Sequence, residues 1–409
     1  MRYQFPISAT VISAITISAL LLLAPLAFSS NAALNFITQI CITSVFALSF
    51  NLLLGQTGLL SFGHAVYSGL GAFAAVHAMN RISEGTWSLP ISLVPLVAGL
   101  AGLFFGALFG WLSSKKSGLT FSMISLGIGE LVFAGAAMFP TIFGGEGGVS
   151  ANRVSGTAWL GISFGPQIEV TYLIIIWTLL VAGTIYFLTL TPLGKLASAV
   201  RENAERLAFL GFDPRWMRFL MLCFSCFFAG VAGGLSALHF EIATTDNLSM
   251  LRSGSILLFT YIGGTALFLG PVLGAVLAIV MSVFLSEITP AWQLYLGTLF
   301  MLTVSFAPQG ISGLLVTYSN AIRLAIHQNR LRILMGLSFA YFAAAALLCS
   351  GAVILIELLY RWRFPIESFR EIVLLGAHFS AQNNSSWASA FILFGLGIFL
   401  LCSLRKSQR

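Results

Sequence analysis

Few residues in this 409-residue chain could do chemistry, and the most suggestive ones lie in apolar surroundings. Gln56, Ser61 and His64 stand close together at the start of an apolar stretch whose glycines let another helix approach. These three side chains could line a route for a polar solute, although a single histidine there more often serves packing. Glu130 lies in the middle of another apolar segment, where an ionisable group indicates either a solute pathway or a packing network.

The sequence lacks the motifs of enzymes and of metal centres. Gly194-Lys195 is followed by leucine and has no upstream glycine, so it is not a phosphate-binding P-loop. Cys223 and Cys226 have the C-x-x-C spacing of some metal and redox sites, but no second pair accompanies them. We interpret both cysteines as small buried hydrophobic residues. The sequence therefore predicts a protein that is not an enzyme itself and that uses no cofactor or metal.

The composition identifies the class of protein that must position these residues. Hydrophobic residues make up 58% of the chain and charged residues 8%, with a mean hydropathy of +0.96. Because a soluble domain carries about a quarter charged residues, the sequence predicts an all-α polytopic membrane protein embedded in lipid. The net charge of +7 follows from orientation in the membrane and does not indicate nucleic-acid binding.

Apolar segments predict about twelve membrane crossings. Seven precede residue 240, at about residues 7–28, 33–54, 59–79, 89–112, 119–140, 170–190 and 219–238. Three follow residue 290, at about residues 292–306, 333–359 and 387–404. Between these groups, residues 253–285 are apolar but too long for one ordinary span, and GGTALFLGP interrupts them. We therefore predict either two shorter passes or a re-entrant hairpin there.

The distribution of lysine and arginine tests this topology. If the N-terminus is cytoplasmic and residues 253–285 turn back at the glycines, most of the 20 basic residues lie inside, as the positive-inside rule requires. The basic residues left outside are Arg81, Arg153, Arg252, Arg361, Arg363 and Arg370. A single pass through residues 253–285 would move the last basic loop outside. Both termini are therefore predicted to be cytoplasmic.

The most polar continuous stretch, residues 192–218, links two predicted spans. Thr191 and Pro192 are typical of a helix start, and Gly211 is placed to end the helix. An apolar stripe at helical spacing consists of Leu193, Leu196, Val200, Ala204 and Leu207. The pattern predicts one short amphipathic helix. From the residues alone it is either a solvated loop helix or a docking element for a soluble partner.

Several motifs, taken together, resemble the M-type permeases of ABC transporters for branched-chain amino acids. GQTGLLSFGHAVYSGLGAFAA, beginning at Gly55, is similar to a family signature, and SLGIGELVF at residues 125–133 places the glutamate of the family on Glu130. GGEGG at residues 144–148, AVRENAERLAFLGF at residues 199–212 and GGTALFLGPVLGA at residues 263–275 match three further motifs. Their order and spacing agree over about residues 40–315. Ala266 departs from the pattern by replacing a glycine.

This resemblance implies one membrane subunit of an importer in a bacterial-type cytoplasmic (inner) membrane. Its expected partners are a second homologous permease subunit, two cytoplasmic ABC ATPase subunits and an external solute-binding protein. The resemblance implies that an ATPase-coupling loop contains Arg201, Glu202, Asn203, Leu210 and Gly211. It favours the docking interpretation of residues 192–218. The candidate translocation residues are Gln56, Ser61, His64, Glu130, Gly145, Gly263 and Gly264.

Residues 1–317 are expected to form the permease core, and residues 318–409 an extension with two further spans. The resemblance implies a branched-chain amino acid as solute, with urea or a short-chain amide as the alternative. A channel or secondary transporter without ATPases is an alternative of another class, and inverted repeats would favour it. A structural membrane protein is a third alternative, which Glu130 and the polar loop disfavour.

Overall fold

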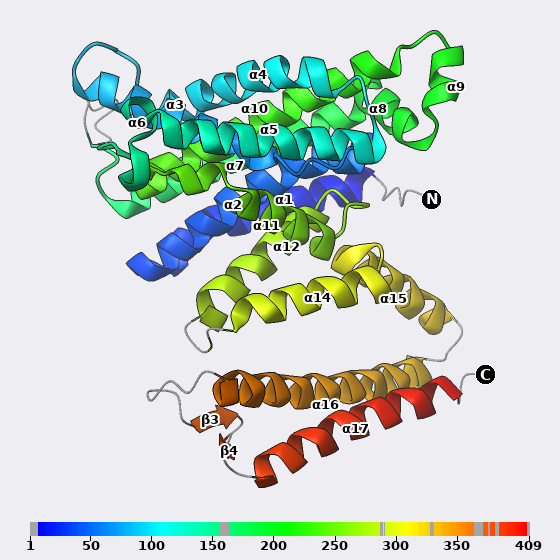
Figure 1. Ribbon diagram of the computed structural model, residues 1–409. Coiled ribbons are helices and arrows are strands. Elements are labelled where there is room, and N and C mark those ends of the chain that lie inside the picture. Colours follow the sequence, from blue (N-terminus) through cyan, green and yellow to red (C-terminus); the bar gives the residue numbers. More distant parts are fainter. Residues whose placement is uncertain are drawn as a thin grey trace. The chain divides into compact units, whose positions relative to one another are not determined.

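The structure of this chain is a computed structural model that describes residues 7–154, 163–286, 289, 291–327, 331–363, 371–374, 377–380 and 384–406. The chain divides into two compact units (Figure 1). The first contains Met1–Glu287 and Leu296–Leu314, and the second contains Ile288–Tyr295 and Leu315–Arg409. Almost all regular structure is helical.

Long helices form the first unit. They are α1 (Ile7–Ala27), α2 (Asn31–Thr57), α3 (His64–Ser83), α4 (Val94–Ser113), α5 (Gly118–Met138), α7 (Gln167–Leu190) and α10 (Pro214–Phe240). Shorter helices are η1 (Ile91–Leu93), α6 (Pro140–Phe143), η2 (Gly145–Gly147), α8 (Pro192–Glu202), α9 (Ala204–Phe209), η3 (Thr245–Leu248), α11 (Met250–Gly263), α12 (Gly270–Val280) and η4 (Met281–Leu285). Strands β1 (Val149–Ser150) and β2 (Ile242–Ala243) pair antiparallel.

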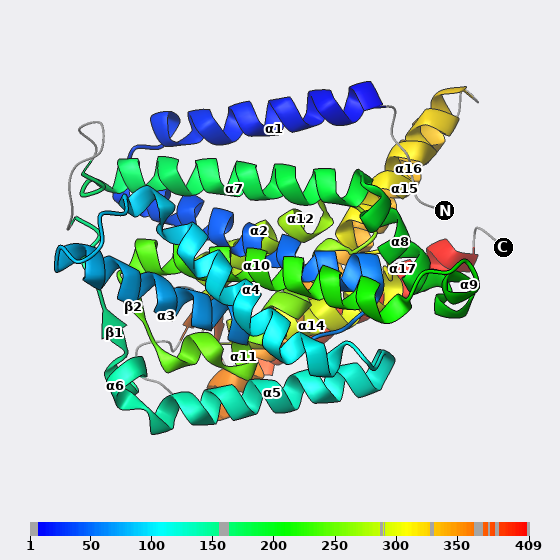
Figure 2. The ribbon, with the colours of Figure 1, turned by 90° about the horizontal axis from the view of Figure 1, so that it is seen from above.

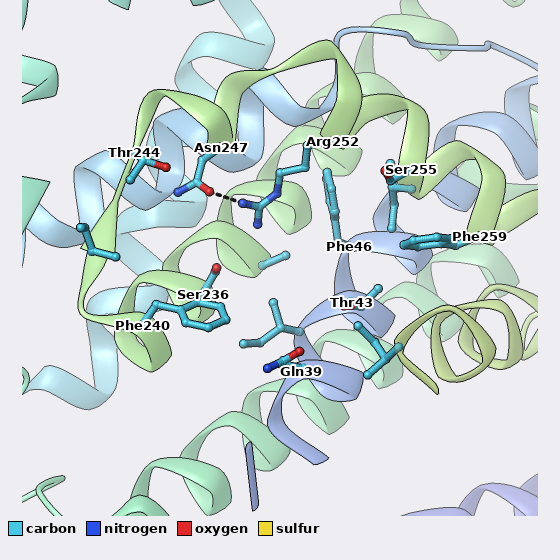
Figure 3. A pocket seen from close by; sticks show the side chains of 15 residues that line it. Gln39, Thr43, Phe46, Ser236, Phe240, Thr244, Asn247, Arg252, Ser255 and Phe259 are labelled. Atoms are coloured by element: carbon cyan, nitrogen blue, oxygen red, sulfur yellow. Dashed lines mark hydrogen bonds between the residues drawn. The ribbon is translucent and has the colours of Figure 1, made fainter. Parts of the chain in front are cut away.

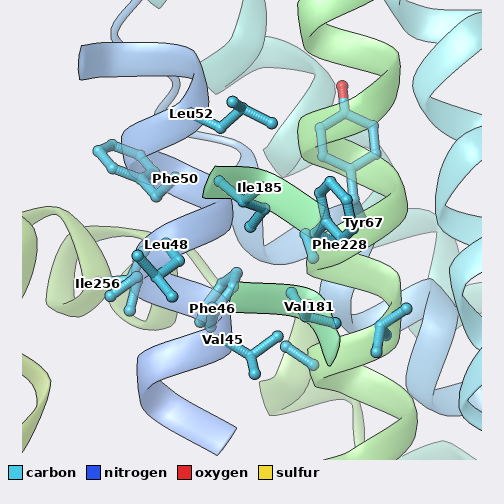
Figure 4. Packing of buried hydrophobic residues seen from close by; sticks show 14 of the residues in the cluster. Val45, Phe46, Leu48, Phe50, Leu52, Tyr67, Val181, Ile185, Phe228 and Ile256 are labelled. Carbon is cyan, nitrogen blue, oxygen red and sulfur yellow. The ribbon is translucent and has the colours of Figure 1, made fainter. Parts of the chain in front are cut away.

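The core of this unit lies around α2 and α10, whose most apolar windows are each 78% buried. Helices α1 and α7 cover one side of the core, and α5 lies on the opposite side (Figure 2). Side chains from α2, α3, α7, α10 and α11 meet in the core, as Figure 4 shows for Phe50, Tyr67, Ile185, Phe228 and Ile256. Because residues on all faces of α2 are buried, this helix is apolar all round rather than striped.

Glycines allow α3 and α10 to pack with their backbones in contact. A Cβ added to Gly233 of α10 would lie 1.8 Å from the carbonyl oxygen of Ser68 in α3. A Cβ added to Gly71 of α3 would lie 2.7 Å from the Cα of Gly230. Such close approach is how small residues stabilise helix pairs inside membranes, where apolar burial between helices gives little driving force.

The predicted third span begins five residues too early. Residue 59 was expected to start a helix, but the helix begins at His64. The reason is that Gly58, at φ 72°, ends α2 with its amide bonded to the carbonyl of Leu54. The following turn is held by tertiary bonds instead of helical ones, since the amide of Phe62 donates to Ser125 Oγ over 3.1 Å.

The single amphipathic helix predicted after Pro192 is wrong in one respect, because Asn203 divides it. Asn203 has extended backbone angles (φ −158°, ψ 101°), ends α8 and caps α9 with its side chain. The predicted break in residues 253–285 is confirmed, because α11 and α12 are separate helices of 14 and 11 residues. Each rises about 1.5 Å per residue and is therefore shorter than the roughly 30 Å hydrocarbon core of a bilayer.

The remaining helices are α14 (Trp292–Phe306), α15 (Gly310–His327), α16 (Leu331–Arg363) and α17 (Asn384–Lys406). Helices α14 and α15 each have residues in both units. The segment Gly310–Ser319 of α15 is bent by 50° relative to α14. Within the second unit, α16 and α17 pack antiparallel, with Gly351 beside Phe394 and Gly397 beside Leu348. Strands β3 (Glu371–Leu374) and β4 (Ala377–Ser380) form a hairpin between them.

Five of the described helices or helix runs are long and apolar enough to cross a membrane, and the bent pair at residues 292–319 would make a sixth. The five are Asn31–Thr57, Ile91–Ser113, Gly118–Met138, Gln167–Leu190 and Pro214–Phe240. Shorter apolar helices cover Ile15–Ala27, Gly270–Leu285, Ala346–Tyr360 and Ser385–Gly397. The chain is therefore a multi-pass helical membrane protein. About twelve crossings and cytoplasmic termini stay predictions.

Candidate functional site

The polar α8–α9 segment is fixed to the C-terminal end of α2. The guanidinium Nη1 of Arg201 donates a 2.6 Å hydrogen bond to the carbonyl of Gly55. One turn earlier, Ser198 Oγ donates to Gln56 Oε1 over 2.9 Å. Ser198 is buried against α2. These contacts make the segment part of the bundle rather than a loosely attached loop.

Capping residues determine where the helices of this segment begin and end. Thr191 accepts a hydrogen bond from the amide of Gly194 and starts α8. Asn203 Oδ1 accepts from the amide of Arg206 over 2.9 Å and starts α9. Gly211 takes the left-handed φ of 86° in the turn that follows, and Asp213 then caps α10. The result is a compact corner between α7 and α10.

The outer surface of the corner is both apolar and charged. Phe209 is 91% exposed and Leu210 is 68% exposed, next to the exposed charges of Glu202 and Arg206. The sequence analysis named Leu210 but not Phe209. The available signal was that Phe209 is an apolar residue outside the stripe that α8 and α9 bury. The corner lies at the same end of the first unit as the start of α1, opposite β1, β2 and α6 (Figure 1 and Figure 2).

The predicted translocation residues do not gather in one place. Gln56 borders a small cavity of about 60 Å³ together with Asn51, Thr189 and Thr265. Ser61 is buried in the turn before α3. Gly145 lies in η2, among the loops at the end opposite α9.

His64 lies among aromatic side chains at the start of α3. Its side chain is fully buried, and Nε2 shares a hydrogen bond with Ser49 Oγ at 3.1 Å. The ring stacks on Phe46 with centroids 5.6 Å apart and meets Phe50 edge to face. These contacts fix the start of α3 against α2. Its Nδ1 is buried without a hydrogen-bond partner among the described residues, and a place for His64 in the solute pathway stays a prediction.

Glu130 has the opposite environment. It lies near the middle of α5 on the face that is exposed in this chain. On the same face, a Cβ added to Gly127 would have no atom within 4 Å among the described residues. Neighbouring positions on that face are Met123, Leu131 and Ala134. Its side chain is exposed within the described part of this chain, and its role in a pathway or in packing stays a prediction.

Gly263 and Gly264 form the turn between α11 and α12. A Cβ on Gly263 would lie 2.0 Å from the carbonyl oxygen of Gly270, and Gly264 has φ 103°. Gly310, at φ 70°, approaches Gly264 so closely that a Cβ there would lie 2.4 Å from its Cα. The backbone at Gly263 and Gly264 therefore approaches Gly270 and Gly310 too closely for a side chain at these positions. Glycine at these positions makes the tight turn possible, and a place for Gly263 and Gly264 in the solute pathway stays a prediction.

A cavity larger than the one beside Gln56 lies elsewhere and was not predicted. It has a volume of about 310 Å³ and is bordered by α2, α10, β2, η3, α11 and α12. Its polar lining consists of Gln39, Thr43, Ser236, Thr244, Asn247, Arg252 and Ser255. Figure 3 shows the side chains of Arg252, Ser236 and Gln39 around the same space, with Phe46 and Phe240 beside it.

Sequence reasoning missed this site because its residues come from distant parts of the chain. Arg252 was used only to assign the orientation in the membrane. Gln39 and Thr43 lie in the apolar α2, and only the fold brings them opposite Arg252. The one signal in the sequence was an arginine at the start of an apolar helix, next to Asn247.

Comparisons with known proteins agree with the motifs. Residues 32–305 match the family described as the permease component of branched-chain amino acid transport systems. The high-affinity branched-chain amino acid transport system permease protein LivM of Escherichia coli (strain K12) is 26% identical over 304 residues, 69% of this chain and 70% of that protein. The protein of the same name from Salmonella typhimurium is 26% identical over 303 residues, with the same shares.

A third relative is the fructose import permease protein FruF of Bifidobacterium longum, 28% identical over 205 residues, 48% of this chain and 53% of that protein. No solved structure matches the chain. The family match runs from α2 into α14 and includes both the α8–α9 corner and the cavity beside Arg252. With its apolar helices and its match over more than half its length, this chain belongs to the family of permease components of branched-chain amino acid transport systems.

Proposed function

We propose that this chain is one of two permease subunits of an ATP-driven importer for branched-chain amino acids in a bacterial cytoplasmic (inner) membrane. Its partners in this proposal are a second homologous permease, two cytoplasmic ATPase subunits and an external solute-binding protein. The family match and the names of the two LivM relatives support the class of transporter and the solute. ATP hydrolysis is assigned to the partner subunits.

The observation that carries the proposal is the α8–α9 corner. Its inner side is bonded to α2 through Arg201 and Ser198, whereas its outer side presents Phe209 and Leu210 to solvent. Exposed aromatic and aliphatic side chains among charges are typical of a protein interaction site. An ATPase subunit seated there would act on α2 and α10 directly, which is what coupling to a transport cycle requires.

The arrangement of the first unit supports the proposed orientation. The corner and the start of α1 lie at one end, so a cytoplasmic N-terminus would place the corner in the cytoplasm with the ATPases. The charge distribution assigned both Arg153 and Arg252 to the outer side. Arg153 follows β1 in the chain, and Arg252 follows β2 and η3. Both arginines therefore come shortly after the strands that lie at the end opposite the corner. In this orientation the cavity beside Arg252 belongs to the outer half of the protein. About twelve crossings, a permease core of residues 1–317 and an extension of residues 318–409 complete the proposal.

Glu130 and the face around it indicate where the second permease packs. A charged group near the middle of a span faces protein or a water-filled pathway rather than lipid. The neighbouring Gly127 and Ala134 are small enough to allow another helix to approach closely. We therefore assign the exposed face of α5 to the contact between the two permeases, with Glu130 at or beside the solute pathway.

The test is purification of the tagged chain from its native membrane, with identification of the proteins that accompany it. We expect two ATPase subunits and a second permease with the wild-type chain, and loss of the ATPases with Glu202→Arg or Phe209→Asp. Glu146→Arg is the matched control, since it reverses the same charge on an exposed residue of η2 at the opposite end.

Two results would contradict the proposal. ATPases that remain at normal stoichiometry with both corner variants would remove the corner as the docking site. A chain that purifies alone and moves solute into vesicles without ATP would be a channel or secondary transporter instead. Uptake of urea or a short amide in preference to leucine would keep the importer and replace the solute.

A further inference from the structure

The cavity beside α11 has the size and lining of a small-molecule site. Its volume of about 310 Å³ is at the lower end of the roughly 300–1,000 Å³ that ligand pockets span. Phe46, Phe240, Phe259 and Ile256 supply apolar walls, and a few polar groups converge from other directions. This combination of apolar walls with sparse, directed polar groups is the usual composition of a selective site.

Arg252 is the charged group of this cavity and has donors to spare. Its guanidinium donates to the side-chain oxygen of Asn247 and lies over the ring of Phe46, 6.0 Å from the centroid. Ion pairs in the described part of the chain include Arg81–Glu84 and Arg153–Glu241, and Arg252 takes part in neither. A guanidinium has five N–H donors and stays protonated. Within the described part of the chain, Arg252 is thus a permanent cation without a counter-charge.

Arg153 shows what a purely structural arginine looks like in the same chain. Its guanidinium donates to the carbonyls of Phe164 and His239, and Glu241 lies 3.6 Å away. Its fork of donors is used to join the loop after β1 to the end of α10. Among the described residues, the guanidinium of Arg252 donates to Asn247 alone, and it borders the cavity. It also lies at the N-terminal end of α11, where the helix dipole disfavours a cation and favours an anion.

We propose that the cavity binds the carboxylate of an apolar amino acid, with Arg252 as the carboxylate-binding residue. A planar carboxylate fits the guanidinium fork with two parallel hydrogen bonds. The aromatic and aliphatic wall then contacts the solute's side chain, and the neutral oxygens of Gln39 and Ser236 accept hydrogen bonds from its ammonium group. This inference rests on the proposed function, because it places the site on the route of a transported amino acid.

The site gives the permease its own selection between solutes. An amide or urea lacks the negative charge that would neutralise Arg252, so it leaves this half-buried cation with Asn247 and the Phe46 ring but without a counter-charge. Leaving such a group unpaired costs more than a lost neutral hydrogen bond. The cavity therefore prefers a zwitterionic amino acid over an uncharged analogue of the same shape, independently of the external binding protein.

The experiment compares L-leucine with L-leucinamide, which keeps the side chain and the ammonium group but removes the negative charge. The full-length chain is purified in lipid nanodiscs, and its thermal unfolding is measured with each compound over the same concentration series. We expect L-leucine to raise the Tm of the wild-type chain and L-leucinamide to leave it unchanged. This comparison needs no mutation, so it holds even if a variant folds poorly.

Variants then assign the effect to one residue. Arg252→Gln should weaken the response to leucine by about ten- to a hundredfold, and Arg252→Lys should retain part of it. Arg81→Gln is the matched control, because Arg81 is an exposed arginine assigned to the same side of the membrane. Equal shifts with leucine and leucinamide, or an unchanged response in Arg252→Gln, would overturn the inference.

The outcome is separable from that of the proposed function. In proteoliposomes containing the whole importer, Arg252→Gln should reduce leucine uptake while the ATPases remain bound. If the ATPases never accompany the chain, the importer proposal fails although the binding result stands. If they do, and leucine uptake by Arg252→Gln equals that of the wild type, only the carboxylate site fails.

Discussion

The guanidinium of Arg201 in α8 donates a 2.6 Å hydrogen bond to the backbone carbonyl of Gly55 in the last turn of α2. A cation at the C-terminal end of a helix meets carbonyls that have no partner within the helix. The Cγ of Arg201 also passes 3.1 Å from the place where Gly58 would carry a Cβ. The same helix α2 borders the 310 Å³ cavity with Gln39 and Phe46, so one rigid element connects the corner with the cavity.

Replacing Arg201 by glutamine should uncouple the corner from α2. The lost bond is worth about 1 kcal/mol, because the guanidinium is partly in water. We expect folding and ATPase binding to persist, whereas leucine-dependent stimulation of ATP hydrolysis in proteoliposomes should fall. Arg81→Gln is the control, since Arg81 is an exposed arginine in the last turn of α3, outside the corner. Equal stimulation in Arg201→Gln and the wild type would show that the bond carries no coupling.

Asn203→Ala should loosen α9 without disturbing the membrane helices. The Asn203 side chain accepts from the amide of Arg206 at 2.9 Å, and loss of such a cap costs about 0.5–2 kcal/mol. Hydrogen exchange at the amides of residues 204–209 should become faster, while exchange in α10 stays unchanged. Asn203→Asp preserves the acceptor and should preserve protection. Protection that survives in Asn203→Ala would mean that burial of Leu207 alone holds α9 in place.

The sequence predicts most of the helices well, because a long apolar run in a membrane protein has few alternatives to a helix. The predicted span at residues 292–306 coincides with α14, and residues 7–28 differ from α1 by one residue. Errors occur where tertiary contacts or caps compete with the apolar pattern. At residues 59–63 the bonds to α5 replace helical ones, and at Asn203 the side-chain cap ends a helix that the apolar stripe would continue.

The sites were harder to predict than the helices. The corner residues follow one another in the chain, so a local motif was enough to propose Arg201 and Leu210 as coupling residues. The cavity depends on α2 and α11, which are separated by about two hundred residues, and no local pattern relates Gln39 to Arg252. The environment of Glu130 could not be predicted either. Its depth in a span follows from hydropathy, but the face it occupies depends on how α5 packs.

Gly233→Ala should prevent normal packing of α3 against α10. The new methyl group would lie 1.8 Å from the carbonyl oxygen of Ser68, and backbone cannot yield as a flexible side chain can. Overpacking of this kind costs about 1–3 kcal/mol or more. We expect a lower yield of monodisperse protein and a lower Tm in detergent. Gly183→Ala in α7 is the matched control, because nothing lies within 4 Å of its added Cβ. Similar losses for both variants would contradict the contact.

Glu130→Gln separates a role in the fold from a role between subunits. The side chain is exposed in this chain, so the Tm of the purified chain should change by less than the equivalent of about 0.5 kcal/mol. Once the second permease covers α5, the charge lies within the complex, where its removal should lower leucine uptake or the amount of the second permease that co-purifies. Glu84→Gln removes the same charge from an exposed residue at the end of α3 and should change neither. If Glu130→Gln destabilises the isolated chain, the carboxylate serves its fold; if uptake and assembly are also normal, the α5 face carries no function through this residue.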